Sequence, residues 1–253
     1  MKSKLCLFGL INSLVLCFSI QATAQSKDMF LEAFSGQWLI FDSSFSTSPA
    51  PCSFELTNVI ELRGVVEESQ LRPSGTSENC VAPFDSVKAW DIEDNQLALY
   101  AENDALIARL GGNQNRVTGD VGDTFRSVIL ERANGAPENA KFSQALREHR
   151  CIYKGYTAEC ATKEELALPI FTEGGGVISS VELLVNLNVR EQPRGNSLSV
   201  GTLPKGTCLK VNYCTTASDG IWCRARFGEA AGWIKKTMLR KDEWPIATYL
   251  NAC

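Results

Sequence analysis

The side chains best suited to chemistry are ten cysteines and one histidine, His149, in a chain of 253 residues. A single imidazole excludes metal centres built on two or three histidines, and it leaves one candidate base for a Ser/His/Asp or Cys/His set. His149 is flanked by arginines beside Cys151, without a recognisable nucleophile motif, and is predicted to be a surface residue. We assign no catalytic, cofactor-binding or metal-ligating residue and predict that the protein is not an enzyme.

The N-terminus has the three parts of a secretory signal peptide. Lys2 and Lys4 precede an apolar run over residues 5–20, and Ala22-Thr23-Ala24 forms a small-x-small cleavage site. We therefore expect residues 1–24 to be removed, leaving a periplasmic or secreted protein. No later segment approaches the roughly 18 apolar residues of a membrane span. Export and a net charge of −4 argue against a nucleic-acid partner.

Loss of Cys6 and Cys17 with the signal leaves an even set of eight cysteines, which in an exported protein predicts disulfides. The final four cysteines allow three connectivities. The Asp219-Gly220 turn favours one hairpin pair, with the other pair fastening the C-terminus. The sequence does not choose securely among them, and the candidate residues are Cys52 with Cys80, Cys151 with Cys160, Cys208 with Cys253, and Cys214 with Cys223.

Charge divides the chain into two modules. Residues 25–135 hold 8 basic and 17 acidic side chains, whereas residues 177–241 hold 10 basic and 4 acidic ones. Such asymmetry suggests two domains with different partners. Residues 136–176 are expected to form a connector with one helix over Glu138–Arg150 and a small disulfide loop, and residues 242–253 a C-terminal tail.

The first module is a succession of short alternating apolar runs separated by turn residues, which predicts an antiparallel barrel or sandwich. Trp38 and Trp90 are expected in its core. The run Val128–Leu130 is apolar on both faces. The eight predicted strands are Gln37–Phe41, Ser53–Thr57, Val65–Leu71, Val87–Ile92, Gln96–Ala101, Ala105–Leu110, Arg116–Val121 and Ser127–Glu131.

Residues 30–133 resemble the bacterial alkaline-proteinase inhibitor family and its related outer-membrane lipoproteins. The resemblance rests on Gly36-Gln37-Trp38-Leu39, Cys52-x-Phe54-x-Leu56, Cys80, Trp90 and Leu97-x-Leu99. It implies an eight-stranded lipocalin-like barrel with a Cys52–Cys80 bond bracing one end. It also implies inhibition of a secreted, serralysin-type zinc metalloprotease.

In that family the inhibitory element is an N-terminal arm, a short strand that enters the protease cleft and shields the metal. The arm corresponds here to Gln25, Ser26, Lys27, Asp28, Met29, Phe30 and Leu31. This sequence departs from the small, apolar arm of the inhibitors, because it carries the charged residues Lys27 and Asp28. Either charge is costly to bury in a protease cleft without a partner.

Residues 178–240 resemble a bacterial SH3-like domain. The motifs follow its order: Leu187-Asn188-Val189-Arg190, Leu203-Pro204-Lys205-Gly206-Thr207, Trp222-Cys223-Arg224-Ala225-Arg226 and Gly232-Trp233-Ile234. The expected fold class is therefore all-β, a barrel followed by a smaller SH3-like β-barrel. Ala225 and the added cysteines depart from the family pattern.

The resemblance implies a groove for cell-wall peptides or glycans, and the basic charge of this module suits peptidoglycan or another anionic envelope polymer. The candidate contacts are Arg190, Arg194, Tyr213, Trp222 and Trp233. Two functions follow. The first is protease inhibition by a protein that this module attaches to the envelope; the alternative is a non-inhibitory envelope-binding protein whose barrel is a scaffold.

Overall fold

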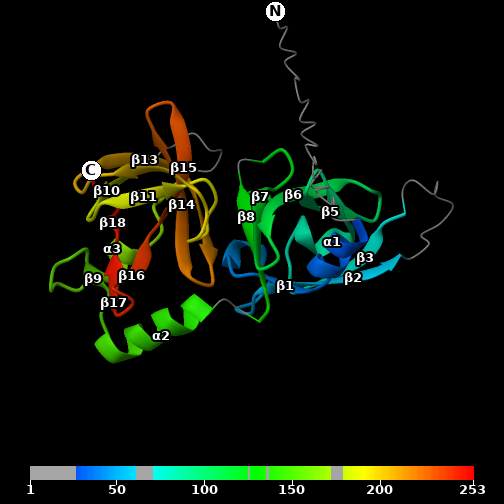
Figure 1. The fold of residues 1–253 in the computed structure, drawn as a ribbon, viewed down its shortest axis with the longest axis horizontal. Coiled ribbons are helices and arrows are strands. Elements are labelled where there is room, and N and C mark those ends of the chain that lie inside the picture. Colours follow the sequence, from blue (N-terminus) through cyan, green and yellow to red (C-terminus); the bar gives the residue numbers. More distant parts are fainter. Residues whose placement is uncertain (1–26, 61–70, 125, 135–136, 172–178) are drawn as a thin grey trace, which may run out of the picture.

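A computed structural model describes residues 27–60, 71–124, 126–134, 137–171 and 179–253 of the chain. They form two β-rich modules that lie side by side (Figure 1). The predicted signal peptide, Gln25 and Ser26 lie outside the described residues. Among the described residues, no helix has the length and apolar character that crossing a bilayer requires.

The first module is a closed eight-stranded antiparallel barrel, as the sequence predicts. Each strand pairs with the next strand in the chain, and β1 also pairs with β8, which closes the barrel. In that last pairing Trp38 lies opposite Arg132. The strands are β1 (Gly36–Ile40), β2 (Cys52–Ile60), β3 (Pro73–Glu78), β4 (Val87–Glu93), β5 (Gln96–Ala101), β6 (Leu106–Asn113), β7 (Arg116–Asp120) and β8 (Ser127–Arg132), with 3-10 turns at Ser43–Phe45 and Phe84–Ser86.

The third strand is the exception to the predicted pattern. It is Pro73–Glu78 rather than Val65–Leu71, of which residues 65–70 lie outside the described part. A Cβ atom at Gly75 would lie 3.2 Å from Leu56 Cδ2 and 3.8 Å from Trp90 Cδ1. Leu56 and Trp90 fill the space that an inward side chain at Gly75 would occupy. Because glycine stands there, β3 lacks the alternation of apolar residues by which a strand is predicted.

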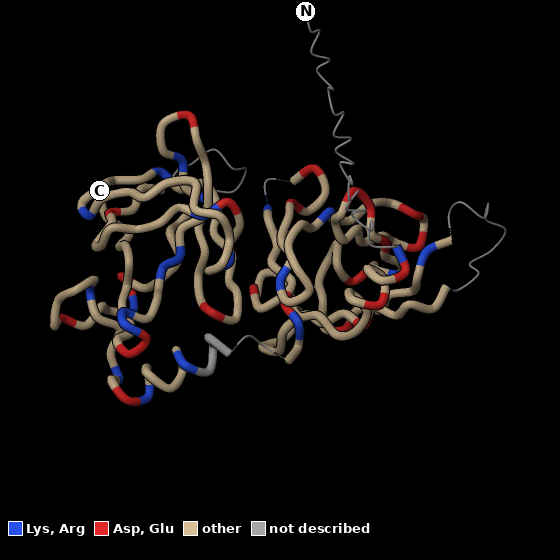
Figure 2. Tube along the Cα trace, in the orientation of Figure 1, with Lys and Arg blue, Asp and Glu red and all other residues tan. Residues whose placement is uncertain are grey.

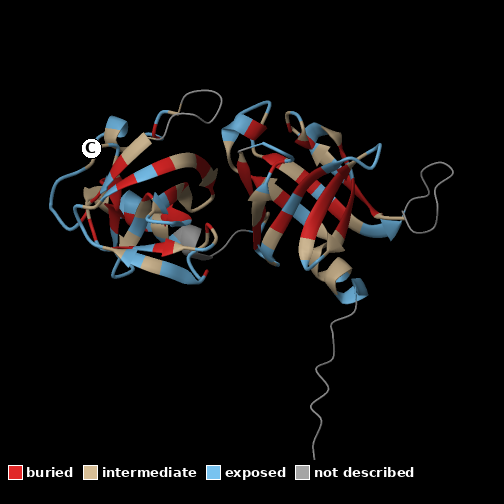
Figure 3. Cartoon of the chain, turned by 90° about the horizontal axis from the view of Figure 1, so that it is seen from above, coloured by how far each residue is buried: buried red, intermediate tan, exposed pale blue. Residues whose placement is uncertain are grey.

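The barrel interior holds both predicted core tryptophans, Trp38 and Trp90, fully buried. Each indole N–H is satisfied, because Trp90 donates to the Thr57 carbonyl (2.8 Å) and Trp38 to the Phe34 carbonyl (2.9 Å). Burial of indole rings with paired N–H groups contributes apolar area without a desolvation penalty. Buried positions recur along the strands of both modules, while the turns are exposed (Figure 3).

A short helix, α1 (Lys27–Phe34), precedes the barrel and packs against it. Leu31 and Phe34 contact the barrel core, and the Phe34 ring stacks on Trp38 with 5.9 Å between centroids. The helix ends where Gly36 takes a φ of 110°, which an L side chain rarely adopts. The segment predicted to be an extended arm is thus helical over its described residues.

The second module contains a seven-stranded sheet in the order β12-β11-β15-β14-β13-β10-β18. Alternate residues of its strands, such as Val181, Leu183, Val189 and Val211, fill a separate core. The strands are β10 (Ser179–Leu183), β11 (Leu187–Arg190), β12 (Ser199–Leu203), β13 (Cys208–Ala217), β14 (Gly220–Phe227), β15 (Ala230–Lys235) and β18 (Tyr249–Leu250).

The connector and the C-terminal residues belong to this module. The predicted helix is α2 (Pro137–His149), and the connector adds β9 (Tyr153–Lys154) and α3 (Lys163–Leu166). A three-stranded sheet joins β9 to β16 (Thr237–Arg240) and β17 (Trp244–Ala247). The C-terminal tail, residues 242–253, packs on this module, and Ile246, Ala247 and Tyr249 are buried.

Within the described residues, four disulfides form in the pairing that the sequence favours. The bonds are Cys52–Cys80, Cys151–Cys160, Cys208–Cys253 and Cys214–Cys223. Cys214 and Cys223 lie opposite each other in the β13–β14 hairpin. The Cys208–Cys253 bond ties the end of the chain to β13.

Candidate functional site

The outer face of β8 is covered by the second module. Ile129, on the strand whose apolar run occupies both faces, clusters with Ala217, Trp222 and Trp233. Tyr213 packs against the same cluster and donates from its hydroxyl to the Ser127 carbonyl (2.8 Å). The apolar residues on both faces of β8 reflect burial in the barrel on one side and in the junction on the other.

Beside this cluster, buried ionic groups join the modules. Arg116 of β7 contacts Glu131 of β8 (Nε–Oε1, 3.1 Å) and Asp219 of the β13–β14 turn (Nη2–Oδ1, 2.9 Å). Lys235 reaches the second oxygen of Asp219 at 2.7 Å. Ser218 donates to Glu131 from both its backbone N–H (2.6 Å) and its hydroxyl (2.7 Å). Four charges are thus shared by three strands and one turn.

Electrostatics favour the charged forms of Asp219 and Arg116. Burial by itself raises the pKa of Asp219, but the charges of Lys235 and Arg116 outweigh it and hold that pKa below the usual value. Burial alone would lower the pKa of Arg116, because it disfavours the charged guanidinium. The charges of Asp219 and Glu131 outweigh burial and raise that pKa above its usual value. Removing one member of such a buried set costs about 3–5 kcal/mol, because its partners are left uncompensated. The junction therefore holds the two modules in one fixed arrangement.

This arrangement covers much of the predicted envelope-ligand groove. Trp222 is 2% exposed, and the half-buried Tyr213 packs beside it against the first barrel. Arg190 donates to the Ser197 carbonyl (2.7 Å) and Arg194 to the Gln192 amide oxygen (2.8 Å), so both arginines brace their own loop. The five predicted contacts do not form one open surface, and among them only Trp233 lines a groove at the edge of the junction.

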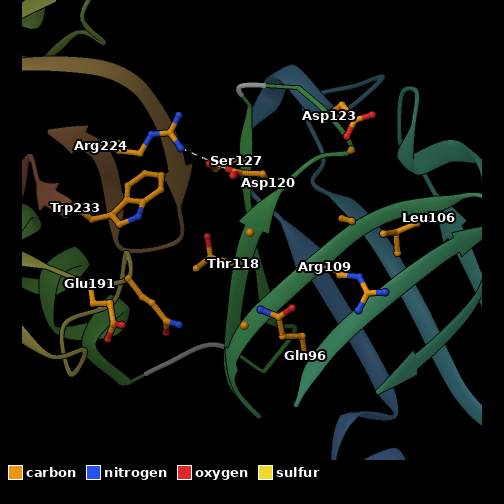
Figure 4. Close-up of a pocket in the computed structure, with 15 residues that line it drawn as sticks. Gln96, Leu106, Arg109, Thr118, Asp120, Asp123, Ser127, Glu191, Arg224 and Trp233 are labelled. Carbon is orange, nitrogen blue, oxygen red and sulfur yellow. Dashed lines mark hydrogen bonds and ion pairs between the residues drawn. The ribbon is translucent and has the colours of Figure 1, made fainter. Parts of the chain in front are cut away.

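That groove lies between the modules and encloses about 660 Å³ (Figure 4). One wall is the outer surface of β6 and β7, and the opposite wall comes from β14, β15 and the loop after β11. The residues that line it are Gln96, Leu106, Ala108, Arg109, Gly111, Thr118, Gly119, Asp120, Gly122, Asp123, Ser127, Glu191, Gln192, Arg224 and Trp233.

Glycines form part of the groove wall. A Cβ at Gly111 would lie 3.5 Å from Gln192 Nε2 and 3.7 Å from Gln96 Nε2, which are ordinary contact distances. A Cβ at Gly119 would lie 1.9 Å from the Arg109 carbonyl oxygen, so that position requires glycine. The glycines leave backbone accessible between two amide side chains that come from different modules.

The first module carries many acidic positions along its trace (Figure 2), and its charges reach the groove. Arg224 of the second module forms an ion pair with Asp120 at 3.6 Å across the junction, and Arg109 forms one with Glu93 at 2.7 Å. Both arginines of the groove are thus held by carboxylates of the first module.

Of the predicted inhibitory arm, Lys27, Asp28, Met29, Phe30 and Leu31 all lie in α1. The expected strand is replaced by a helix because Leu31 packs on the barrel core, where a helical turn places Phe34 beside it. The Lys27 ammonium forms an ion pair with Asp91 at 2.8 Å.

The single imidazole serves packing. His149 lies 4.4 Å from Trp244 and 5.8 Å from Tyr153, measured between ring centroids, and fastens the end of α2 to the second module. Within the described ranges, no group of three or more His, Cys, Asp or Glu side chains is placed to hold a metal ion.

Sequence reasoning missed the junction, including Arg116, Glu131 and Asp219. The available signal was the apolar run of β8, which indicates a second covered face. No protein-family model and no curated protein matches the chain.

Proposed function

We propose that this chain is an exported, non-enzymatic binding protein of the cell envelope, and that its ligand lies in the groove between the barrel and an SH3-like second module. The observation that carries the proposal is the groove of about 660 Å³, whose walls come from both modules. Four disulfides support an oxidising, extracytoplasmic location.

The fixed junction favours binding. A groove whose walls are already in place loses little conformational entropy when a ligand enters. The edge of Trp233 offers an apolar contact, and the amides of Gln96 and Gln192 offer donors and acceptors to peptide or N-acetyl groups. The ligand would then lie at the edge of the aromatic face that the sequence predicts, beside Trp233.

Co-sedimentation of the mature, oxidised protein with purified cell-wall sacculi tests this function. The informative variant is Gly111→Leu, which fills the groove at a position where a Cβ meets no closer atom than 3.5 Å. Ala50→Leu, at an exposed loop outside the groove, is the matched control. We expect at least fivefold weaker binding for Gly111→Leu and unchanged binding for Ala50→Leu. Equal binding by both variants, or no binding by folded wild type, would overturn the proposal.

Protease inhibition is the second candidate, and the docking of α1 favours it. The Lys27 charge, costly in a protease cleft, is neutralised by Asp91 of the same barrel. Arg132 also donates to the carbonyls of Ala33 and Ser35 at the end of the helix, which fixes where the chain leaves the barrel. Only Gln25 and Ser26 would then enter the cleft.

The test is inhibition of a serralysin-type zinc protease by the mature protein and by a form beginning at Lys27. Removal of two residues leaves α1 and its barrel contacts in place, so a loss of inhibition reports on the arm alone. Submicromolar inhibition that disappears on this truncation supports the second candidate. Absence of inhibition by folded mature protein excludes it.

A further inference from the structure

The charge pattern of the groove distinguishes among ligands. Its two arginines are already engaged: Arg109 is 2.7 Å from Glu93, and Arg224 is 3.6 Å from Asp120 and donates to Asn212. An anionic ligand would have to displace these carboxylates to gain either cation. The groove is therefore a poor site for a phosphate-rich or otherwise polyanionic polymer.

Two other charges of the groove are differently placed. Asp123 lies on the wall of the first module and Glu191 on that of the second (Figure 4), and both are exposed. Neither has an ion-pair partner among the residues that the structure describes. Because the two arginines are already paired with carboxylates, Asp123 and Glu191 give the groove a surplus of negative charge. A cationic ligand would complement that charge.

Between these walls the groove is suited to an amide backbone. Gly111 carries no side chain, and the amides of Gln96 and Gln192 approach it from the two modules. A peptide laid across Gly111 would find donors and acceptors on both sides, at a place where its main chain can approach closely. Phosphodiester backbones lack the paired N–H and carbonyl groups that such amides recognise.

We infer that the junction groove binds a short peptide that carries a protonated amine, with its main chain between Gln96 and Gln192 and its positive charge toward Asp123 or Glu191. This inference rests on the proposed function and narrows the ligand of the same groove. It differs from the anionic polymer that the basic charge of the second module suggests.

Calorimetric titration of the mature protein with acetyl-Ala-Lys-Ala-amide tests the inference. The matched neutral probe is the same peptide with an acetylated lysine side chain, which keeps the length and the main-chain amides. We expect the lysine peptide to bind at least tenfold more tightly than its acetylated form, with weaker binding at higher salt.

The double variant Asp123→Asn, Glu191→Gln should reduce this preference to less than threefold, while Glu229→Gln, an exposed carboxylate outside the groove, should retain it. Equal affinity for both peptides, a preference that persists in the double variant, or no binding of either peptide would overturn the inference. Co-sedimentation with sacculi that is lost in Gly111→Leu would, in each of those cases, leave the broader proposed function standing.

Discussion

Arg116 and Asp219 come from different modules and form an ion pair of 2.9 Å in which each side chain is only 10% exposed. Arg116 also donates to the Pro193 carbonyl at 2.9 Å, so one guanidinium contacts two separate loops of the second module. Because Glu131 and Lys235 complete the network, the charges of the junction are balanced locally. This contact makes the groove beside it a fixed feature of the fold.

Replacing Asp219 by asparagine should destabilise the protein strongly. The Asp219→Asn variant leaves Arg116 and Lys235 without a shared carboxylate, and we expect a loss of about 3 kcal/mol in the free energy of unfolding. Urea denaturation followed by tryptophan fluorescence measures the loss, since Trp222 donates to Asp219 and lies in the junction. The control Glu229→Gln should change stability by less than about 0.5 kcal/mol. Equal stability of the two variants would show that the network does not hold the modules together.

Acid should loosen the same junction. The folded-state pKa of Asp219 is lowered, because Lys235 and Arg116 outweigh the effect of burial. Its contribution to stability is therefore complete above the unfolded pKa of about 3.9, and it is lost as the pH falls through the lower folded value. Thermal unfolding between pH 6 and pH 2 should show a steeper fall for wild type than for Asp219→Asn. Parallel curves would contradict this assignment.

Lys236 should make the folded protein more stable as the pH rises above 8. This fully buried lysine donates to the Ala167 carbonyl (2.7 Å) and the Asn251 amide oxygen (2.9 Å), and burial lowers its pKa to about 8. Above pH 8 the folded state loses a proton that the unfolded state keeps, so stability rises by at most ~1.4 kcal/mol per pH unit.

The measurement is the free energy of unfolding at pH 7, 8 and 9, below the range in which unfolded tyrosines ionise. The Lys236→Met variant removes the titrating group and should lack the rise between pH 8 and pH 9. A rise of the same size in both proteins would assign it to another group.

The disulfides should differ in their effect on stability. On the chain-entropy model, the Cys52–Cys80 bond, with a separation of 28 residues, contributes about 3–4 kcal/mol. The Cys151–Cys160 bond, with a separation of 9, contributes about 2–3 kcal/mol. Paired alanine replacements, compared by urea denaturation under oxidising conditions, should show the larger loss for the barrel bond. The reverse order would contradict a mainly entropic effect.

The sequence predicted the elements whose residues alternate or repeat. Seven of the eight barrel strands and the helix after Pro137 follow from patterns within short segments. The sequence favoured the four observed cysteine pairs but did not choose securely among the last four cysteines. The third strand does not follow from such a pattern, because Gly75 faces Trp90 and leaves no apolar signal. Local patterns report on the space around a residue only when a side chain fills that space.

The candidate site was less predictable, for a physical reason. Trp222 and Tyr213 have the character of ligand contacts, yet the first barrel covers them. Whether an aromatic face binds a ligand or another module depends on how the two modules dock. In the sequence, the apolar residues on the outward face of β8 were the only local sign of that docking. The groove contains residues from eight separate segments, and its existence follows from that docking.

Amide chemical-shift mapping of the isotope-labelled mature protein, titrated with solubilised cell-wall fragments, tests the central claim most directly. We expect the largest shifts at Gly111, Gly119 and Gln192, from both sides of the junction, and we expect Gly111→Leu to remove them. Shifts confined to α1 or to the far side of either module, or no shifts with folded protein, would contradict a binding site between the two modules.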